Sequence, residues 1–322
     1  MTDHPAPRVN RTEHFYRVGA PSLFWEMTVC QCLGRRGSPY QAALVEPAPY
    51  GALVARYLAR VTGRRRWGSV VEIGGGYGTL MEAFLHEARP ASVTMVDLSP
   101  RFLAEQQEAL TGRGGCRFVE ADAVEFLGRL AGAVDLVIAN ENLGDLPTVT
   151  GLRRDGVLRA AAGALDPPDP LTAEVARVVR RYGLDLSGAP DTFAFNLGAV
   201  ELVEALAGRA RVAFLVEHSC DVVLPEPYGF LPLELGDGYP RRVALKDHDE
   251  YTIRFAVLEA VARGLGFRVH RFHLAEAIGL RSDEGIRFMA RTGATSSETA
   301  QVVHELCAHV AEYQGMILTR EV

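Results

Sequence analysis

The chain has 322 residues, of which 48% are hydrophobic and 23% charged, with a formal net charge of −6. This composition excludes disorder over most of the chain, and the acidic balance argues against a nucleic-acid-binding protein. No apolar run approaches the roughly 18 residues of a membrane-spanning helix, and the polar start lacks the apolar part of a secretory signal. We therefore expect a cytoplasmic protein of one or two domains, without a membrane or nucleic acid as partner.

The five cysteines are irregularly spaced and odd in number, so no disulfide framework is predicted. His304, Cys307 and His309 could lie near one another on a helix. A structural zinc ion normally takes four ligands, and the sequence offers no fourth one at a suitable spacing. We therefore predict no metal site.

Four strand–helix units follow one another from Trp67 onward. The short apolar run at 69–73 predicts a buried strand, and a glycine-rich turn separates it from a helical pattern at 79–85. Further strands are expected at 92–96, 116–119 and 134–139. Successive strand–helix units predict a parallel sheet with helices on both faces and right-handed crossovers.

Strand character returns three times after a largely helical stretch, at 211–217, 267–272 and 315–319. The sequence thus predicts an α/β fold with seven strands. We expect a mostly helical N-terminal segment at residues 1–66, followed by a sheet domain at 67–322. That domain is expected to carry two helical insertions, near 148–195 and near 282–312.

The glycine-rich turn does not fit a dinucleotide site. The dinucleotide fingerprint requires glycine or alanine at its sixth position, where the register that starts at Gly74 has Thr79. Glu72 stands two residues before Gly74, and a carboxylate in a buried strand costs several kcal/mol unless a ligand or residue pairs with it. S-adenosylmethionine carries an ammonium and a sulfonium and has no pyrophosphate, so it fits this turn as the cofactor.

Two further acids follow strands on the same side of the predicted sheet. Asp97 ends the second strand, 23 residues after Gly74, where a ribose diol would be bound. A carboxylate can accept hydrogen bonds from both ribose hydroxyls. Asp122 follows the third strand and could accept from an adenine amino group, while Ala123 could offer its backbone N–H to the ring.

These residues resemble the class I S-adenosylmethionine-dependent methyltransferases. The stretch from Glu72 to Gly78 is similar to their glycine-rich motif, and Asp97 and Asp122 resemble their ribose and adenine acids. The resemblance implies a Rossmann-like, mostly parallel sheet of seven strands with an antiparallel last strand, and S-adenosylmethionine as cofactor. It implies cofactor contacts from Glu72, Gly74, Gly76, Gly78, Asp97, Leu98, Asp122, Ala123 and Asn140.

A narrower resemblance is to the MidA-like methyltransferases. Residues 71–81 are similar to their E-I-G-P-G-x-G-T-L-M stretch, 140–147 to their N-E-x-x-D-x-x-P motif, and 46–51 to their P-E-I-S-x-x-F-G segment. Gly75 replaces the proline of the glycine motif, and the aspartate of the second motif falls one residue later. That family includes protein arginine methyltransferases that act on a subunit of respiratory complex I, so the resemblance implies arginine as a substrate class.

Glu141 and Asp145 follow the fourth strand, where a methyl acceptor would meet the cofactor. Our hypothesis is that Glu141 orients a nitrogen nucleophile and Asp145 assists, because two carboxylates suit the forked donors of a guanidinium. The alternative is that Glu141 holds the cofactor or caps its loop. His218 could be a base at the edge of the crevice, but a structural histidine is the favoured interpretation. Tyr16 and Tyr50 could cover the cofactor, but packing is favoured for both. His248 is expected in a solvated turn.

Two other function classes stay open. One is a small-molecule O- or N-methyltransferase with the helical insertions as a lid, and the other is a non-catalytic assembly factor that binds the cofactor. A dehydrogenase is disfavoured by Thr79. The methyl acceptor is not identified by the sequence, and apolar stretches in the N-terminal segment could serve a homodimer.

Overall fold

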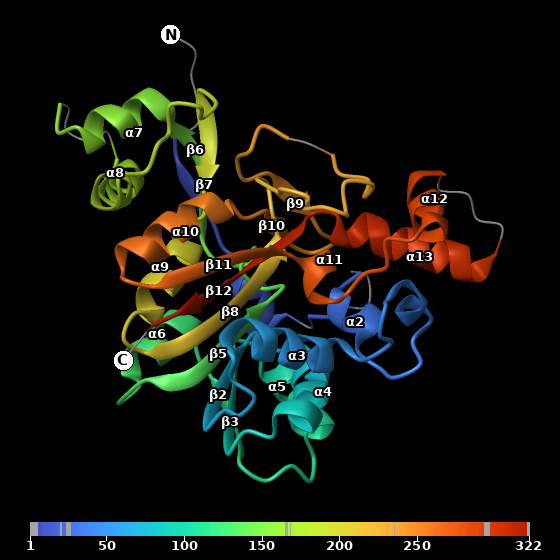
Figure 1. Ribbon diagram of the computed structural model, residues 1–322. Coiled ribbons are helices and arrows are strands. Elements are labelled where there is room, and N and C mark those ends of the chain that lie inside the picture. The colour runs from blue at the N-terminus through green and yellow to red at the C-terminus, as the bar shows by residue number, and fades with distance from the viewer. Residues whose placement is uncertain are drawn as a thin grey trace.

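The computed structural model describes residues 6–19, 21–23, 27–164, 167, 169–234, 236–292 and 297–320. A sheet of seven strands forms its centre (Figure 1). β12 runs antiparallel to both neighbours, and the other strands run parallel to one another. The α/β fold and its seven strands are confirmed. In spatial order the strands are β11 (Arg268–His273), β12 (Tyr313–Thr319), β8 (Ala210–His218), β5 (Val134–Asn140), β2 (Ser69–Ile73), β3 (Ser92–Asp97) and β4 (Cys116–Glu120).

Alternate side chains of each central strand enter two separate hydrophobic cores. In β5, Leu136 and Ile138 belong to one core, whereas Val137 and Ala139 belong to the other. Both faces of the sheet are therefore covered by helices, as Figure 1 shows. One core contains α3 (Tyr50–Thr62), α4 (Thr79–Ala88), α11 (Leu274–Ala277) and α13 (Glu298–Val310), and the other contains α6 (Ala123–Arg129), α9 (Leu197–Leu206) and α10 (Phe255–Gly264).

The chain changes direction across the sheet between β2 and β5. β3 and β4 lie on one side of β2, while β5 and β8 lie on the other. Ligands of open α/β sheets bind in the crevice at such a point, at the carboxyl ends of the strands. Here the residues after β2, β3, β4 and β5 are the glycine turn, Leu98, Ala121 and Glu141.

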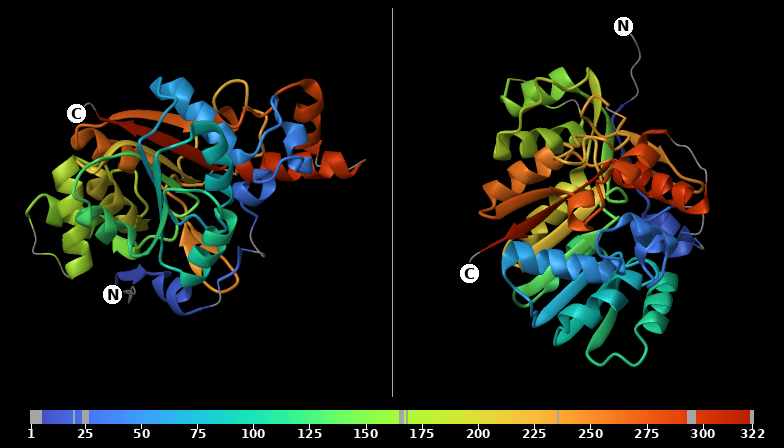
Figure 2. Two further views of the ribbon diagram at one scale, coloured as in Figure 1. Left: turned by 90° about the horizontal axis from the view of Figure 1, so that it is seen from below. Right: turned by 45° about the vertical axis from the view of Figure 1, so that its right-hand side comes forward.

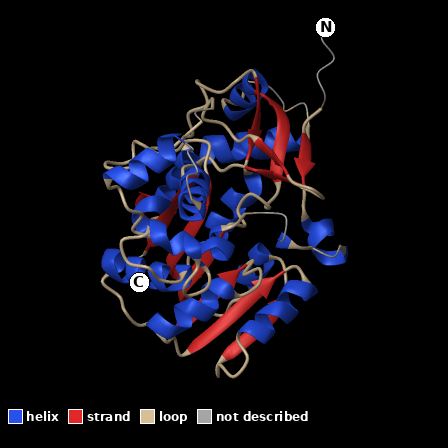
Figure 3. Ribbon diagram, turned by 90° about the vertical axis from the view of Figure 1, so that its right-hand side faces the viewer, coloured by secondary structure: helices blue, strands red, loops and turns tan. Residues whose placement is uncertain are grey.

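The segment expected as a helical insertion near 148–195 also contains strands. Beside α7 (Arg154–Ala161) and α8 (Pro170–Tyr182) it holds β6 (Thr148–Arg153) and β7 (Thr192–Phe195). These strands and β1 (Arg8–Asn10) form a separate sheet, with β6 in the middle, at the top of Figure 3. The helical interpretation omits these strands because β6 is interrupted: Gly151 has a φ of 75°, and the register with β7 shifts there.

The remaining elements lie outside the main sheet. In the N-terminal segment, residues 1–5, 20 and 24–26 lie outside the described residues. The 3₁₀ helix Pro39–Ala43 of this segment packs on α13, and Figure 2 shows the two side by side. None of the described helices combines the length and the apolarity needed to span a bilayer. The other elements are α1 (Glu13–Val18), α2 (Val29–Leu33), α5 (Pro100–Ala109), β9 (Arg242–Ala244), β10 (Asp249–Tyr251) and α12 (Glu284–Thr292).

Candidate active site

Two adjoining cavities lie at the carboxyl edge of the sheet. The first is bounded by the strand ends on one side and by residues 11–16 on the other. The second extends toward β8, β12 and the β9–β10 hairpin. The residues that line both are Tyr16, Leu23, Gly74, Gly76, Glu141 and Asp145.

The glycine turn brings backbone close to both cavities. Gly74 and Gly76 have φ values of 62° and 50°, in the left-handed region that favours glycine. A Cβ on Gly74 would lie 2.5 Å from Nδ2 of Asn142, so any other residue there would have to displace the Asn142 side chain. Gly78, predicted as a cofactor contact, lines neither cavity. It allows α4 to approach α5 instead, since its Cβ would lie 3.2 Å from Cα of Gln106.

Glu72 is a buried carboxylate beside the second cavity. Its exposed fraction is 2%, and its Oε2 atom has no hydrogen-bond partner among the described residues. Burial, with a smaller contribution from the charge of Asp97, raises the pKa of Glu72 to about 8. A ligand that brings an ammonium to this oxygen would remove the cost of the unpaired carboxylate.

Asp97 lines the first cavity and is held in place by two donors. Its Oδ1 accepts the N–H of Ser99 at 2.9 Å, and its Oδ2 accepts Nε2 of Gln106 at 2.9 Å. Burial raises the pKa of Asp97 to about 6, although these two hydrogen bonds lower it. Each carboxylate oxygen can accept a second hydrogen bond, so the residue can still receive ribose hydroxyls.

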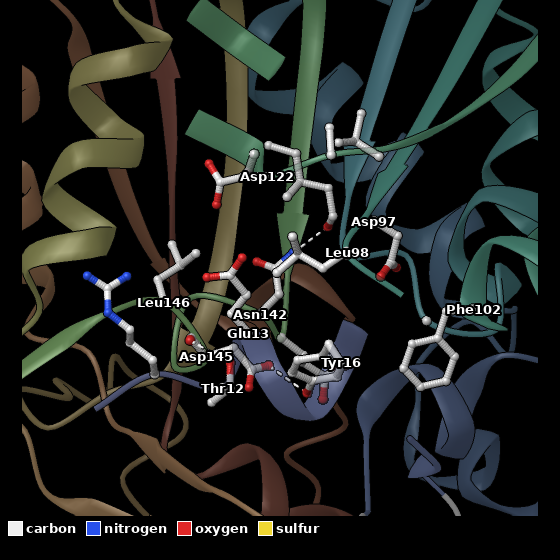
Figure 4. Close-up of a pocket in the computed structure, with 18 of the residues that line it drawn as sticks. Thr12, Glu13, Tyr16, Asp97, Leu98, Phe102, Asp122, Asn142, Asp145 and Leu146 are labelled. Carbon is white, nitrogen blue, oxygen red and sulfur yellow. Dashed lines mark hydrogen bonds between the residues drawn. The ribbon is translucent and has the colours of Figure 1, made fainter. Parts of the chain in front are cut away.

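Asp122 and Leu98 form the wall opposite α1 in the close-up (Figure 4). Oδ1 of Asp122 caps α6 by accepting the N–H groups of Val124 at 2.9 Å and Glu125 at 3.0 Å. Ala123 begins that helix and lines the same cavity. The predicted cofactor residues that follow β3 and β4 are thus gathered in one cavity.

Glu141 is surrounded by donors. Its Oε1 accepts the N–H of Val29 and the hydroxyl of Tyr313, both at 2.8 Å. Its Oε2 accepts Nδ2 of Asn140 at 3.0 Å and the N–H of Cys30 at 3.4 Å. Glu141 itself has a φ of 54°, a strained conformation for a residue with a side chain. These contacts favour the alternative that Glu141 fixes its loop and the start of α2.

The second cavity is rich in acids. Among the described residues that line it, none is lysine or arginine. Its two histidines are neutral, since burial lowers the pKa of His218 to about 3 and that of His309 to about 4. The lining carboxylates are Glu72, Glu141, Asp145, Glu217 and Glu250. The cavity therefore suits a cationic group.

His248 does not lie in a solvated turn, contrary to the sequence interpretation. Its side chain is 4% exposed, and its Nε2 lies 3.5 Å from Oδ1 of Asp145 and 3.2 Å from Oε1 of Glu250. The interpretation was wrong because Asp145, from the segment after β5, and Glu250, in β10, both face the histidine. These ligand-type atoms lie within 4.8 Å of one another, a spacing that would also suit a metal ion. A protonated His248 balances the two carboxylates without one.

Three more residues belong to the site. Tyr16, for which packing was favoured over a place above the cofactor, donates its hydroxyl to Oδ2 of Asp145 at 2.9 Å. Glu217 and Tyr313 were not considered, although Glu217 stands at the end of β8, next to β5. A polar residue at the end of that central strand was the available signal. Tyr50 is fully buried as expected, with its hydroxyl donated to Oδ1 of Asn140 at 2.6 Å.

Comparisons with known proteins agree with this geometry. Residues 71–168 match a family model described as a methyltransferase domain. No curated protein matches the chain. An uncharacterized protein from Burkholderia thailandensis has a similar structure, with 17% identity, a TM-score of 0.53, and coverage of 91% of this chain and 86% of its own. This likeness shows a shared fold.

Two further solved structures are more distant. The plantazolicin methyltransferase BpumL, in complex with SAH, has 12% identity, a TM-score of 0.43, and coverage of 91% of this chain and 89% of its own. An S-adenosylmethionine-dependent methyltransferase from Clostridium acetobutylicum has 9% identity, a TM-score of 0.43, and coverage of 85% and 91%.

The donor set of the cavities fits S-adenosylmethionine. The unpaired buried carboxylate can bind the ammonium of the cofactor. The acids at the ends of two neighbouring strands can accept hydrogen bonds from its ribose and adenine. A side chain at Gly74, which lines both cavities, would clash with Asn142. Together with the match of residues 71–168, this identifies the chain as an S-adenosylmethionine-dependent methyltransferase, with S-adenosylmethionine as its cofactor.

Proposed function

We propose that this enzyme methylates a nitrogen of a cationic group, the guanidinium of an arginine side chain, and that this nitrogen loses a proton in the reaction. The observation that carries the proposal is the second cavity, in which five carboxylates and no described lysine or arginine line the wall. The similarity of the glycine turn and of residues 140–147 to the MidA-like methyltransferases supports the same substrate class.

The cofactor is proposed to lie across both cavities. Bound there, S-adenosylmethionine supplies a methyl group activated by the sulfonium. Glu72 would pair with its ammonium, Asp97 would accept from the ribose, and Asp122 would accept from the adenine amino group. The remaining proposed contacts come from Gly74, Gly76, Leu98, Ala123 and Asn140.

Asp145, Glu141 and Glu217 are proposed to attract and orient the acceptor nitrogen. Asp145 lines both cavities, so it stands where acceptor and cofactor would meet. Glu141 already accepts four hydrogen bonds, so its contribution to the acceptor is electrostatic. Burial and the charge of Glu250 raise the pKa of Glu217 well above its usual value, so that in its ionised form this carboxylate would be a stronger base for the proton that the nitrogen loses on methylation.

A small-molecule enzyme with the helical insertions as its lid has less support. No described residue of α7 or α8 lines either cavity, and from α12 and α13 only His309 does so. The wall that faces the strand ends comes from the N-terminal segment instead. A non-catalytic scaffold would not need an acid-rich cavity beside the cofactor.

The first test measures cofactor binding. Isothermal titration calorimetry with S-adenosylmethionine should give binding to the wild type and a large loss in Asp97→Ala. Asp191→Ala is the matched control, since Asp191 forms an exposed ion pair with Arg154. Absence of binding to the wild type would refute the cofactor site.

The second test concerns the acceptor. The enzyme should transfer a labelled methyl group to arginine-containing peptides. The rate of transfer should be lower with the same peptides in which lysine replaces arginine. Glu217→Gln should reduce transfer while S-adenosylmethionine still binds. Transfer only to uncharged small molecules would overturn the proposed acceptor and leave the cofactor site standing.

A further inference from the structure

The α1 segment, residues 11–18, forms part of the wall of the first cavity. Arg11, Thr12, Glu13 and Tyr16 line the cavity. Figure 4 shows Thr12, Glu13 and Tyr16 on the side away from Asp122. None of the six residues of α1 is buried, and no side chain caps its N-terminus. The segment is thus held by individual contacts rather than by a core of its own.

Most of these contacts converge on one pair of residues. The hydroxyls of Thr12 and Tyr16 donate to the backbone oxygen and to Oδ2 of Asp145, both at 2.9 Å. The ring of Phe15 stacks on that of His248, with centroids 4.3 Å apart and planes at 18°. Two weaker contacts join α1 to other parts of the chain. The ring centroids of Tyr16 and Phe102 are 6.3 Å apart, and Nη1 of the exposed Arg17 lies 3.8 Å from Oε1 of Glu120.

We propose that His248 is a positioning residue that fixes Asp145 and thereby holds the α1 segment closed over the cofactor. The inference rests on the proposed cofactor site. His248 contributes no atom to the first cavity's lining, so it acts through Asp145 and Phe15.

The physical basis is a buried cation between two anions. Burial lowers the pKa of His248, but the hydrogen bonds to Asp145 and Glu250 raise it by more than burial lowers it, so that the pKa is about 10. Four groups face the histidine ring: the carboxylates of Asp145 and Glu250, the Tyr16 hydroxyl at 3.5 Å and the ring of Phe15. Without the imidazolium, Asp145 and Glu250 would repel each other, and the carboxylate that anchors Tyr16 would lose its fixed place.

The test uses the full chain with His248→Gln, which keeps side-chain volume and polarity but removes the charge. Hydrogen exchange in residues 11–18 of the free protein should become at least about tenfold faster, because hydrogen bonds to charged groups are among the strong ones. The dissociation constant of S-adenosylhomocysteine should rise by a similar factor. In turnover assays, KM for S-adenosylmethionine should rise more than kcat falls. Tyr16→Phe, which removes the hydroxyl that contacts Asp145 and His248 but keeps the charge of the histidine, should give a smaller change of the same kind.

The matched control is His270→Gln, because His270 is exposed on β11 and bonds Tyr57 away from both cavities. It should leave exchange and binding unchanged. If His248→Gln leaves exchange in 11–18 unchanged, or accelerates it no more than in the rest of the chain, the proposal is overturned. If the wild type binds no S-adenosylhomocysteine, the proposed cofactor site fails, while the exchange result still decides the role of His248.

Discussion

Tyr313 donates its hydroxyl to Glu141, joining the first residue of β12 to the residue after β5. β8 lies between these two strands, so the bond reaches across a neighbouring strand at the carboxyl edge of the sheet. The same carboxylate accepts from the start of α2. Three distant parts of the chain therefore depend on one side chain that stands next to both cavities.

Replacing Glu141 by glutamine should lower both stability and turnover. The amide NH₂ would face donors that now point at a carboxylate, so we expect a loss of about 2 kcal/mol in the free energy of unfolding. Tyr313→Phe removes one donor and should lose about 1 kcal/mol. Urea unfolding measures both. Equal stability of Glu141→Gln and wild type would contradict the structural role, and unchanged turnover would exclude any role in the reaction.

Binding of S-adenosylhomocysteine should release protons near neutral pH. The pKa of Glu72 is about 8 in the free protein, so this carboxyl is largely protonated at pH 7. Pairing with the ligand's ammonium should lower that pKa and expel the proton. Calorimetry in buffers of different ionisation enthalpy should show release of up to about one proton. The release should vanish in Glu72→Gln; a binding heat independent of the buffer in the wild type would count against the pairing.

The stability that His248 contributes should disappear as pH rises. Its pKa is raised in the folded protein from 6.5 to about 10, so the native state holds the proton more tightly than the unfolded state. The contribution is complete below about pH 6.5 and is lost progressively up to about pH 10. The difference in unfolding free energy between wild type and His248→Gln should therefore shrink over this range. A difference that stays constant would show that the histidine is not charged in the native state.

Alanine at Gly74 should be more damaging than alanine at Gly112. Both glycines have positive φ, 62° and 78°, so each substitution brings backbone strain of roughly 1 to 2 kcal/mol. Only at Gly74 would the new Cβ also meet Asn142, whereas nothing lies within 4 Å of a Cβ on Gly112. Calorimetry should show that cofactor binding is lost in Gly74→Ala and kept in Gly112→Ala. Equal binding by both variants would place the cofactor elsewhere.

The parts predictable from sequence are those encoded locally. The run at 69–73 and the glycines that follow fix a strand and a tight turn, and Asp97 and Asp122 reach the cavity because parallel strands end at the same edge. The role of His248 was hidden because Asp145 reaches it from a distant part of the chain and because the ring of Phe15, from α1, stacks on it. β6 escaped prediction because its pairing with β1 depends on residues far away in sequence.

The pairing of β1 with β6 has a consequence for how the enzyme matures. Arg8 pairs with Thr150, whose hydroxyl also donates to Arg8 across 142 residues of chain. α1 follows β1 after only two residues, so its place over the cavity depends on that strand pair. Closing so long a loop is entropically costly and slow. During synthesis residues 8–18 leave the ribosome before residue 150. The α1 segment can therefore take its place at the first cavity only after the middle of the chain has been made.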